Sequence, residues 1–350
     1  MSQELINWSK KNYSGLPWRR KRSLYNTLVS EIMLQQTTVG TVINHFESFI
    51  TKYPTIESLS KTSEEEICIA WKGLGYYRRA RNLRKAAISI VEDFHGKIPL
   101  DFEKLKTIPG IGEYTASALL SIGANKKALA IDANLERVLS RIYRISVEKG
   151  PKLQKELKRL FEQGDLFKGR SNINWRNLNE SLMDLGRVYC QANKVDCLSC
   201  PLSKSCAVID EDPLIYPKKL NQSKKRESID LELIRVIVKK DDLLLAYKKS
   251  EKEWLSGQKE LPTFILKTND KNLSQYPYWN EQVKLNLGSL KKFKTGITKY
   301  KITNYVLEVS EEKWKKNFSY GKRRFFFVNP DSKDENLSTS STKALIALNN

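Results

Sequence analysis

The sequence predicts a mainly α-helical region over the first 210 residues, followed by a separate α+β domain. Apolar residues recur at helical spacing up to about residue 209, and a segment rich in Pro, Lys and Ser follows Cys206. Beyond residue 228, β-branched and aromatic residues alternate as they do in strands. A chain of 350 residues can hold two or three domains, each with its own hydrophobic core.

Short amphipathic helices account for the first region. Their apolar residues are three or four positions apart, which places them on one face of a helix. Examples are Leu24, Leu28 and Ile32, then Val39, Val42, Ile43 and Phe46, and later Leu135, Val138, Leu139 and Ile142. We interpret these stripes as core packing.

The second domain follows a predicted linker at 210–227 and covers 228–345. Within it, the run LELIRVIVKKDDLLLAYKK predicts two strands joined by a turn at Asp241-Asp242, and Phe325 to Pro330 predicts another strand. Residues 331–342 are rich in Ser, Asp and Thr and are expected to be irregular.

Composition narrows the class of protein. The chain has 61 Lys+Arg and 40 Asp+Glu, a net charge of +21. Residues 1–210 hold 33 basic and 22 acidic residues and 211–350 hold 28 and 18, so both parts are positive and favour a polyanionic partner such as nucleic acid. No apolar run approaches the ~20 residues of a membrane helix, and no leader is apparent. We expect a cytoplasmic protein, nucleoid-associated if bacterial.

Four of the five cysteines form a compact cluster. Cys190, Cys197, Cys200 and Cys206 have the spacing C-x6-C-x2-C-x5-C. Disulfides are not expected in a leaderless chain, so the cluster predicts a metal site. A single loop of four thiolates suits a 4Fe-4S cluster, with zinc as the alternative. Cys68 lies in a helical stripe and is interpreted as a small buried hydrophobic residue.

A glycine-containing turn separates two predicted helices in LKTIPGIGEYTASALL. Pro109, Gly110, Ile111 and Gly112 leave backbone N–H groups that point outward at the start of a helix, and such groups bind phosphate. The other interpretation is an ordinary turn between helices.

Several motifs together resemble one family. Leu-Gln-Gln-Thr (34–37), Gly-Leu-Gly-Tyr-Tyr (73–77), the PGIG turn, Ile-Asp-Ala-Asn (131–134) and the cysteine loop are similar to those of the helix-hairpin-helix DNA glycosylases of the endonuclease III superfamily. Within it, residues 5–207 most resemble the MutY adenine glycosylases. The resemblance implies an iron-sulfur helical subdomain at 1–20 and 131–209, and a six-helix subdomain with the hairpin at 21–130.

The resemblance also implies a pair of catalytic carboxylates. Cutting a purine N-glycosidic bond requires an acid for the departing base and an anion beside the sugar cation. Glu31, in VSEIMLQQT, corresponds to the acid, and burial near Ile32 and Met33 would raise its pKa. Asp132 corresponds to the anion, with Asn134 positioning the catalytic groups. From spacing alone, Glu31 is a solvated helix residue and Asp132 a helix N-cap.

Tyr114 occupies the position at which bifunctional relatives carry a lysine. A phenol cannot form a Schiff base with the sugar, so the resemblance implies a monofunctional enzyme that leaves an intact abasic site.

The resemblance assigns base and strand contacts to a further set of residues, whose amide and aromatic groups suit hydrogen bonding and stacking. They are Trp18, Arg19, Leu34, Gln35, Gln36, Thr37, Tyr76 and Glu180, together with the four residues of the turn. Each is also compatible with plain packing or surface exposure.

The second domain resembles the Nudix-like domain with which this family recognises 8-oxoguanine. Lys259-Glu260-Leu261-Pro262 is similar to the family's aromatic-Glu-Phe-Pro turn, but the carboxylate-rich box of Nudix hydrolases is missing. Thr298 and Lys299 align with the loop that contacts the lesion, where this chain lacks the family's histidine.

These features predict a monomeric, monofunctional adenine DNA glycosylase. Its partner would be double-stranded DNA with adenine opposite 8-oxoguanine or guanine, and its cofactor a 4Fe-4S cluster. A bifunctional pyrimidine glycosylase is the first alternative, against which Tyr114 counts. The second is a non-catalytic iron-sulfur DNA-binding protein, which has no need for two carboxylates beside a phosphate backbone.

Overall fold

The computed structural model describes residues 2–169, 172–219, 228–280, 283–318, 323–332 and 335–349. Its contacts divide the chain into two compact units. Unit 1 comprises Met1–Ser63 and Arg78–Ser223, and unit 2 comprises Glu64–Tyr77 and Lys224–Asn350. The part of the predicted linker at 220–227 lies outside the described residues.

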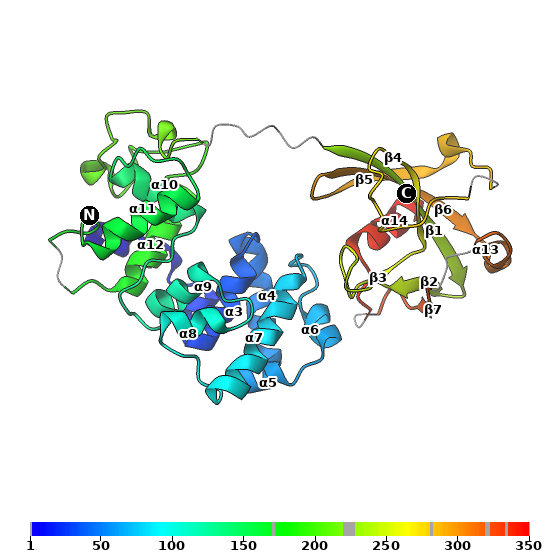
Figure 1. The fold of residues 1–350 in the computed structure, drawn as a ribbon, viewed down its shortest axis with the longest axis horizontal. Coiled ribbons are helices and arrows are strands. Elements are labelled where there is room, and N and C mark those ends of the chain that lie inside the picture. The colour runs from blue at the N-terminus through cyan, green and yellow to red at the C-terminus, as the bar shows by residue number, and fades with distance from the viewer. Residues whose placement is uncertain are drawn as a thin grey trace. The chain divides into compact units, whose positions relative to one another are not determined.

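Unit 1 is built from helices (Figure 1). They are α1 (Ser2–Tyr13), α2 (Pro17–Arg20), α3 (Leu24–Leu34), α4 (Val39–Lys52), α5 (Ile56–Ser60), α7 (Arg78–Phe94), α8 (Phe102–Thr107), α9 (Glu113–Ala118), α10 (Ala133–Ile142), α11 (Pro151–Glu162) and α12 (Trp175–Val188). A π-helical turn, η1 (Leu119–Gly123), continues α9, and short 3-10 turns η2 (Ser203–Ser205) and η3 (Pro213–Ile215) follow α12.

Most of the predicted apolar stripes form the cores of this unit, but Ile43 on α4 is 38% exposed, so the core-packing interpretation is wrong for this residue. Leu135, Val138 and Leu139 are fully buried on α10, and Leu5 from α1 joins the same cluster. Leu28 and Ile32 are buried on α3. Side-chain caps begin several helices, such as Ser23 at α3, whose hydroxyl accepts from the N–H of Asn26. The expectation of a helical first region is confirmed.

Unit 2 contains a seven-stranded mixed sheet. Its strands are β1 (Ile229–Lys240), β2 (Leu243–Lys248), β3 (Lys259–Glu260), β4 (Thr263–Thr268), β5 (Lys291–Ile297), β6 (Tyr300–Val309) and β7 (Phe325–Val328). The unit also contains α6 (Glu64–Ala70), α13 (Glu311–Asn317), α14 (Thr339–Asn349) and a 3-10 turn, η4 (Leu287–Ser289). The α+β expectation is confirmed, and Cys68 on α6 is buried as expected.

Strand β1 lies at the centre of the sheet. It pairs antiparallel with β2 and β4 and parallel with β6, and β5 pairs antiparallel with β6. The predicted turn at Asp241 is confirmed, since Lys240 and Leu243 are paired and Asp241 has a φ of 52°.

One expectation for this unit is wrong. Part of the segment at 331–342 is ordered and buried, because Ser338 and Ser341 are 0% exposed and α14 begins at Thr339. Ser341 accepts a hydrogen bond from the N–H of Leu261 at 3.1 Å, and α14 packs against β5, β6 and β1. Small hydroxyl side chains here satisfy buried backbone groups instead of facing solvent.

Candidate active site and cysteine loop

Glu31 is a buried carboxyl near the end of α3. The residue is 5% exposed, on a helix whose buried residues also include Leu28, Val29, Ile32 and Met33. The hydroxyl of Tyr114 donates a hydrogen bond to Glu31 Oε2 at 2.6 Å. Because Tyr114 lies in the first turn of α9, directly after the PGIG turn, the hairpin and α3 meet at this carboxyl.

The environment of Glu31 makes it a weak acid. The pKa of Glu31 is raised from the ordinary value to about 7, chiefly by burial and to a smaller extent by the charges of Asp132 and Glu180. The Tyr114 hydrogen bond and the charge of Arg19 act in the opposite direction. The predicted rise is therefore confirmed, and a carboxyl with a pKa near neutrality can donate a proton and later accept one.

Asp132 is the N-cap of α10. Its Oδ1 accepts from the N–H groups of Asn134 and Leu135 at 2.9 and 2.8 Å, and its Oδ2 accepts from Asn134 Nδ2 at 2.7 Å. The N-cap interpretation is confirmed. These contacts fix the orientation of the carboxylate, which lies near enough to Glu31 to influence its acidity.

A run of hydrogen bonds continues from Asn134 to the cysteine loop. Arg137 donates to Asn134 Oδ1 at 2.8 Å and, through Nε, to the carbonyl oxygen of Cys190 at 2.7 Å. The sequence analysis missed Arg137, although it lies beside the apolar stripe of α10.

The Leu-Gln-Gln-Thr segment ends α3 in a constrained turn. Leu34 and Gln35 are half-buried, and Gln36 is exposed with a φ of 57°. Gln35 Nε2 donates to Thr115 Oγ1 at 3.4 Å, which connects the segment to α9.

Arg79, which the sequence analysis also missed, holds this turn. Its Nη1 donates to the carbonyl oxygens of Ile32 and Met33 at 2.9 and 2.8 Å, and its Nη2 to Thr37 Oγ1 at 2.8 Å. The guanidinium therefore satisfies carbonyls that the end of α3 leaves without helical partners.

Trp18 and Arg19 lie on α2 and Glu180 on α12; Trp18 and Glu180 are buried, and the Arg19 side chain is 8% exposed. Trp18 packs edge-on against Phe46, with ring centroids 5.7 Å apart. Arg19 Nη1 forms an ion pair with Asp184 at 2.8 Å. Glu180 is bound by Arg22, at 2.6 Å between Nη1 and Oε1.

The PGIG turn joins α8 to α9 as predicted. Gly110 has a φ of 82°, and a Cβ atom there would lie 2.7 Å from Asn82 Cβ, so glycine is needed for both reasons. Ile111 is 4% exposed and anchors the turn, while Pro109, Gly110 and Gly112 are exposed. Gly112 is the N-cap of α9.

The four clustered cysteines are free thiols that line one cavity. Leu185, Leu202 and Val208 contribute apolar walls, and the buried Arg141 lies at the same cavity. Arg141 Nη1 donates to Cys190 Sγ at 3.3 Å, and the N–H of Leu202 donates to Cys200 Sγ at 3.4 Å. Such N–H donors suit thiolate ligands of a metal centre, so this donor set fits the predicted iron-sulfur cluster.

Within the described ranges, no set of three or more His, Cys, Asp and Glu side chains is positioned to hold a single metal ion.

The remaining predicted contacts belong to unit 2. Tyr76 is 60% exposed with a φ of 48°. Thr298 has a φ of 51° in the turn between β5 and β6. Lys299 Nζ forms an ion pair with Asp270 Oδ2 at 2.9 Å, and Tyr300 donates to the same oxygen at 2.5 Å.

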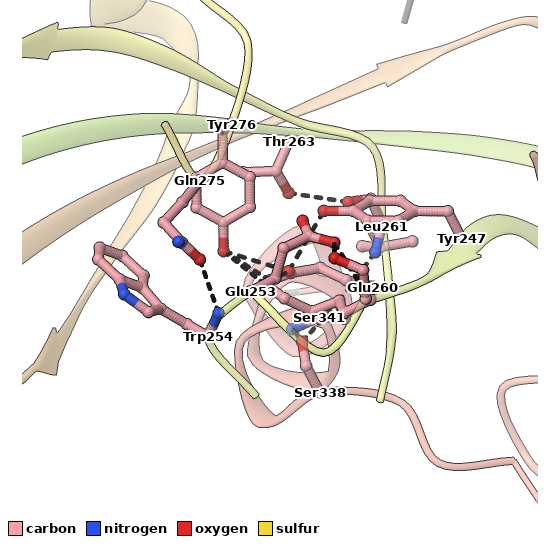
Figure 2. Close-up of polar contacts among 12 residues, drawn as sticks. Tyr247, Glu253, Trp254, Glu260, Leu261, Thr263, Gln275, Tyr276, Ser338 and Ser341 are labelled. Atoms are coloured by element: carbon pink, nitrogen blue, oxygen red, sulfur yellow. Dashed lines mark hydrogen bonds and ion pairs between the residues drawn. The ribbon is translucent and has the colours of Figure 1, made fainter. Parts of the chain in front are cut away.

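Glu260, in the predicted Glu-Leu-Pro turn, is 0% exposed and lies in a buried polar cluster (Figure 2). It forms ion pairs with Arg235, at 2.7 Å, and with Lys249. Tyr276 donates to it at 3.1 Å. Burial alone would raise the pKa of Glu260, but the two cations outweigh burial and lower it to about 2.

Comparisons with known proteins agree with this geometry. Residues 29–163 match the family described as "HhH-GPD superfamily base excision DNA repair protein". The chain is 33% identical to an adenine DNA glycosylase of Buchnera aphidicola subsp. Acyrthosiphon pisum, over 88% of this chain and 85% of the relative. It is 33% identical to the adenine DNA glycosylase of Homo sapiens, over 63% of this chain and 42% of the relative.

A solved structure shares the helical fold. A thermostable thymine-DNA glycosylase superposes with a TM-score of 0.51 and 29% identity, over 60% of this chain and 94% of that chain. The hairpin, the buried carboxyl beside it and these matches define a helix-hairpin-helix glycosylase fold of base excision DNA repair. Within that class, the chain belongs to the MutY-type adenine DNA glycosylase family. No helix among the described residues is both long and apolar enough to cross a membrane.

Proposed function

We propose that this chain is a monofunctional glycosylase that removes adenine paired with 8-oxoguanine or guanine. The observation that carries the proposal is Glu31, a buried carboxyl with a pKa of about 7, hydrogen-bonded to Tyr114 and influenced by the charge of Asp132. An acid poised near neutrality beside a second, oriented carboxylate meets the requirements of N-glycosidic cleavage.

In the proposed reaction, Glu31 donates its proton to N7 of a flipped-out adenine, and the bond between N9 and the sugar breaks as the base departs. The Asp132 carboxylate stabilises the sugar cation, and Asn134 holds Asp132 through the 2.7 Å hydrogen bond from its side-chain amide. Glu31 then accepts a proton from the water that attacks the sugar, which restores the acid.

Tyr114 makes the proposed enzyme monofunctional. It lies where a lysine would serve as the amine of a lyase, and its hydroxyl is bound to Glu31. Without an amine, no Schiff base forms, so the strand stays intact and the product is an abasic site.

We assign a 4Fe-4S cluster to Cys190, Cys197, Cys200 and Cys206. When bound, it would act as a structural crosslink that fixes the loop after α12. Arg141 supports the assignment, since a buried guanidinium that donates to Cys190 Sγ offsets the negative charge of thiolates. Iron and sulfide near four of each per chain would agree with the assignment, and stoichiometric zinc would contradict it.

The architecture proposed for recognition has four parts. Residues 1–20 and 131–209 form the iron-sulfur subdomain, 21–130 the subdomain with the hairpin, 210–227 the linker and 228–345 a Nudix-like lesion-recognition domain. The hairpin turn would hold a DNA phosphate, and Thr298 and Lys299 would face the base opposite adenine. Tyr76, Leu34, Gln35, Gln36 and Thr37 would contact the strand around the flipped base.

The test uses duplexes carrying adenine opposite 8-oxoguanine, adenine opposite guanine, or an oxidised pyrimidine, each treated with and without alkali. We expect breaks at adenine that require alkali. Breaks without alkali would contradict the monofunctional assignment, and cleavage at the pyrimidine alone would favour a pyrimidine glycosylase. Binding without base release would indicate a non-catalytic DNA-binding protein.

A further inference from the structure

Arg22 forms a two-point ion pair with Glu180. Its Nη1 lies 2.6 Å from Glu180 Oε1 and its Nη2 3.0 Å from Oε2, so both carboxylate oxygens are engaged by one planar guanidinium. Arg22 comes from the segment between α2 and α3, 158 residues before Glu180. The Glu180 side chain is 8% exposed and that of Arg22 31%.

The hydrogen bonds of the neighbouring cation, Arg19, go to a different carboxylate. Its two terminal nitrogens donate to Asp184 at 2.8 and 3.3 Å, and Ser9 also donates to Asp184 at 2.6 Å. Arg19 Nε also forms an ion pair with Glu180 Oε1 at 3.5 Å, but it makes no hydrogen bond to it. Among the described residues, Arg22 is therefore the cation that hydrogen-bonds Glu180.

A second neighbour, Arg176, is also occupied. Its Nε and Nη2 donate to the carbonyl oxygens of Ile122 and Gly123 at 2.5 and 2.6 Å, where the π-helical turn η1 leaves them without helical partners. Arg176 thus holds η1 against α12, and the two hydrogen bonds that engage both oxygens of Glu180 come from Arg22.

Glu180 in turn acts on the proposed catalytic acid. The groups that influence Glu31 are Tyr114 from α9, Asp132 at the start of α10, Glu180 from α12 and Arg19 from α2. The two carboxylates raise the pKa of Glu31, and Arg19 lowers it. A carboxylate whose charge is balanced by a hydrogen-bonded guanidinium exerts a weaker field on its neighbours than an unpaired one.

We propose that Arg22 is a positioning residue of the proposed active site, which fixes the Glu180 carboxylate and limits its field at Glu31. Arg22 touches neither the base nor the sugar and acts through Glu180. The inference rests on the proposed function and adds to it a residue that the family motifs did not single out.

The test is a double-mutant cycle with Arg22→Gln, Glu180→Gln and the double variant, measured as single-turnover adenine release over pH 5 to 9. Glu31 must be protonated, so the rate is lost as pH rises through its pKa. The pH at which half of the rate is lost should rise by ~0.5–1 unit in Arg22→Gln, and it should fall in Glu180→Gln. At low pH, Arg22→Gln should slow release about tenfold on its own and less than twofold in the Glu180→Gln background.

Two further variants separate this role from folding or DNA contact. Arg22→Lys keeps the positive charge but cannot engage both oxygens of Glu180. Its rate should therefore be lost at the same pH as in wild type, while the rate at low pH should lie between those of wild type and Arg22→Gln. Arg20→Gln removes a nearby exposed arginine that pairs with Glu47, and it should change neither the rate of adenine release nor its pH dependence.

The outcomes are distinct. The role of Arg22 is overturned if Arg22→Gln slows release equally in wild type and in Glu180→Gln, or if it leaves the pH dependence of the rate unchanged. The proposed function stands in either case. A wild-type protein that releases no adenine overturns the proposed function, and this inference falls with it.

Discussion

Two buried glutamates, one in each unit, have opposite acidities. Glu31 is 5% exposed and Glu260 0% exposed, yet the pKa of Glu31 is raised to about 7 and that of Glu260 lowered to about 2. Burial disfavours the ionised form of both. Glu260 has two cations in contact, whereas Glu31 accepts its hydrogen bond from the neutral Tyr114 and has two carboxylates nearby. The partners, more than the burial, decide whether a buried carboxyl is a structural anion or an acid.

The largest expected effect comes from Glu260→Gln, which leaves Arg235 and Lys249 buried without their counter-charge. We expect a loss of about 3–5 kcal/mol in the free energy of unfolding, measured by urea denaturation. The matched control is Glu308→Gln, which breaks a surface ion pair with Lys239 and should cost about 0–1 kcal/mol. Equal losses in the two variants would show that the buried cluster is not what holds unit 2.

Glu31→Gln should reduce activity and not stability, because no buried cation depends on this carboxyl for a hydrogen bond. Stability at neutral pH should not fall and should rise relative to wild type, because Gln removes the cost of keeping a buried carboxyl from ionising, while adenine release should fall by a factor of ~10²–10⁴. Single-turnover assays and urea denaturation of the same preparation measure the two effects. Unchanged adenine release would refute the assignment of Glu31 as the acid.

The pH dependence of stability should also differ between the two glutamates. Because the folded pKa of Glu31 is raised, its contribution is present below the unfolded value near 4.5 and is lost as pH rises to about 7. Because that of Glu260 is lowered, its contribution is present above 4.5 and is lost as pH falls towards 2. Subtracting the pH–stability curve of each Gln variant from the wild type measures both slopes. Slopes of the same sign would contradict the comparison.

Tyr114→Phe should make Glu31 a still weaker acid. The Tyr114 hydrogen bond lowers the pKa of Glu31, so its loss raises that pKa and moves the alkaline limb of adenine release up, by on the order of one pH unit. Rates over pH 5 to 9 measure the shift. Tyr25→Phe is a control, since its hydroxyl donates to the carbonyl oxygen of Tyr53, away from Glu31. A downward shift in Tyr114→Phe would mean that the hydrogen bond does not favour the ionised form.

The smallest effect is expected at Lys299, whose side chain is 46% exposed although its ion-pair partner Asp270 is largely covered. Lys299→Gln should leave the urea midpoint unchanged but lower the ratio of rates for adenine opposite 8-oxoguanine and opposite guanine by a few fold. Lys301→Gln, a nearby exposed lysine on β6, serves as the control. An equal ratio in wild type and Lys299→Gln would remove Lys299 from the proposed lesion contacts.

The sequence predicted the local features of the site and missed the long-range ones. Helical spacing, the N-cap at Asp132 and the cysteine spacing each depend on residues that are close together in the sequence. Arg22, Arg79 and Arg137 could not be assigned, because an arginine's partner can lie anywhere along the chain and its usual place is the surface. Each of the three instead bonds groups that are far away in the sequence.

In unit 2, the sequence carries one signal of a buried ion pair. Arg235 interrupts the otherwise apolar run of β1, and a charge in the middle of a buried strand requires a buried partner. That partner is Glu260, 25 residues later. The buried serines at the start of α14 could not be predicted from the sequence, because Ser and Thr are also typical of exposed turns and loops.

The hydrogen bond between Ser9 and Asp184 joins residues that are 175 positions apart. During synthesis, α1 is made early, but its partner on α12 emerges only when more than half of the chain has been translated. The same holds for Leu5, whose core also includes Leu202. The N-terminal helix of unit 1 can therefore reach its native contacts only after α12 has been synthesised, and the fold of this unit depends on contacts between residues far apart in the sequence.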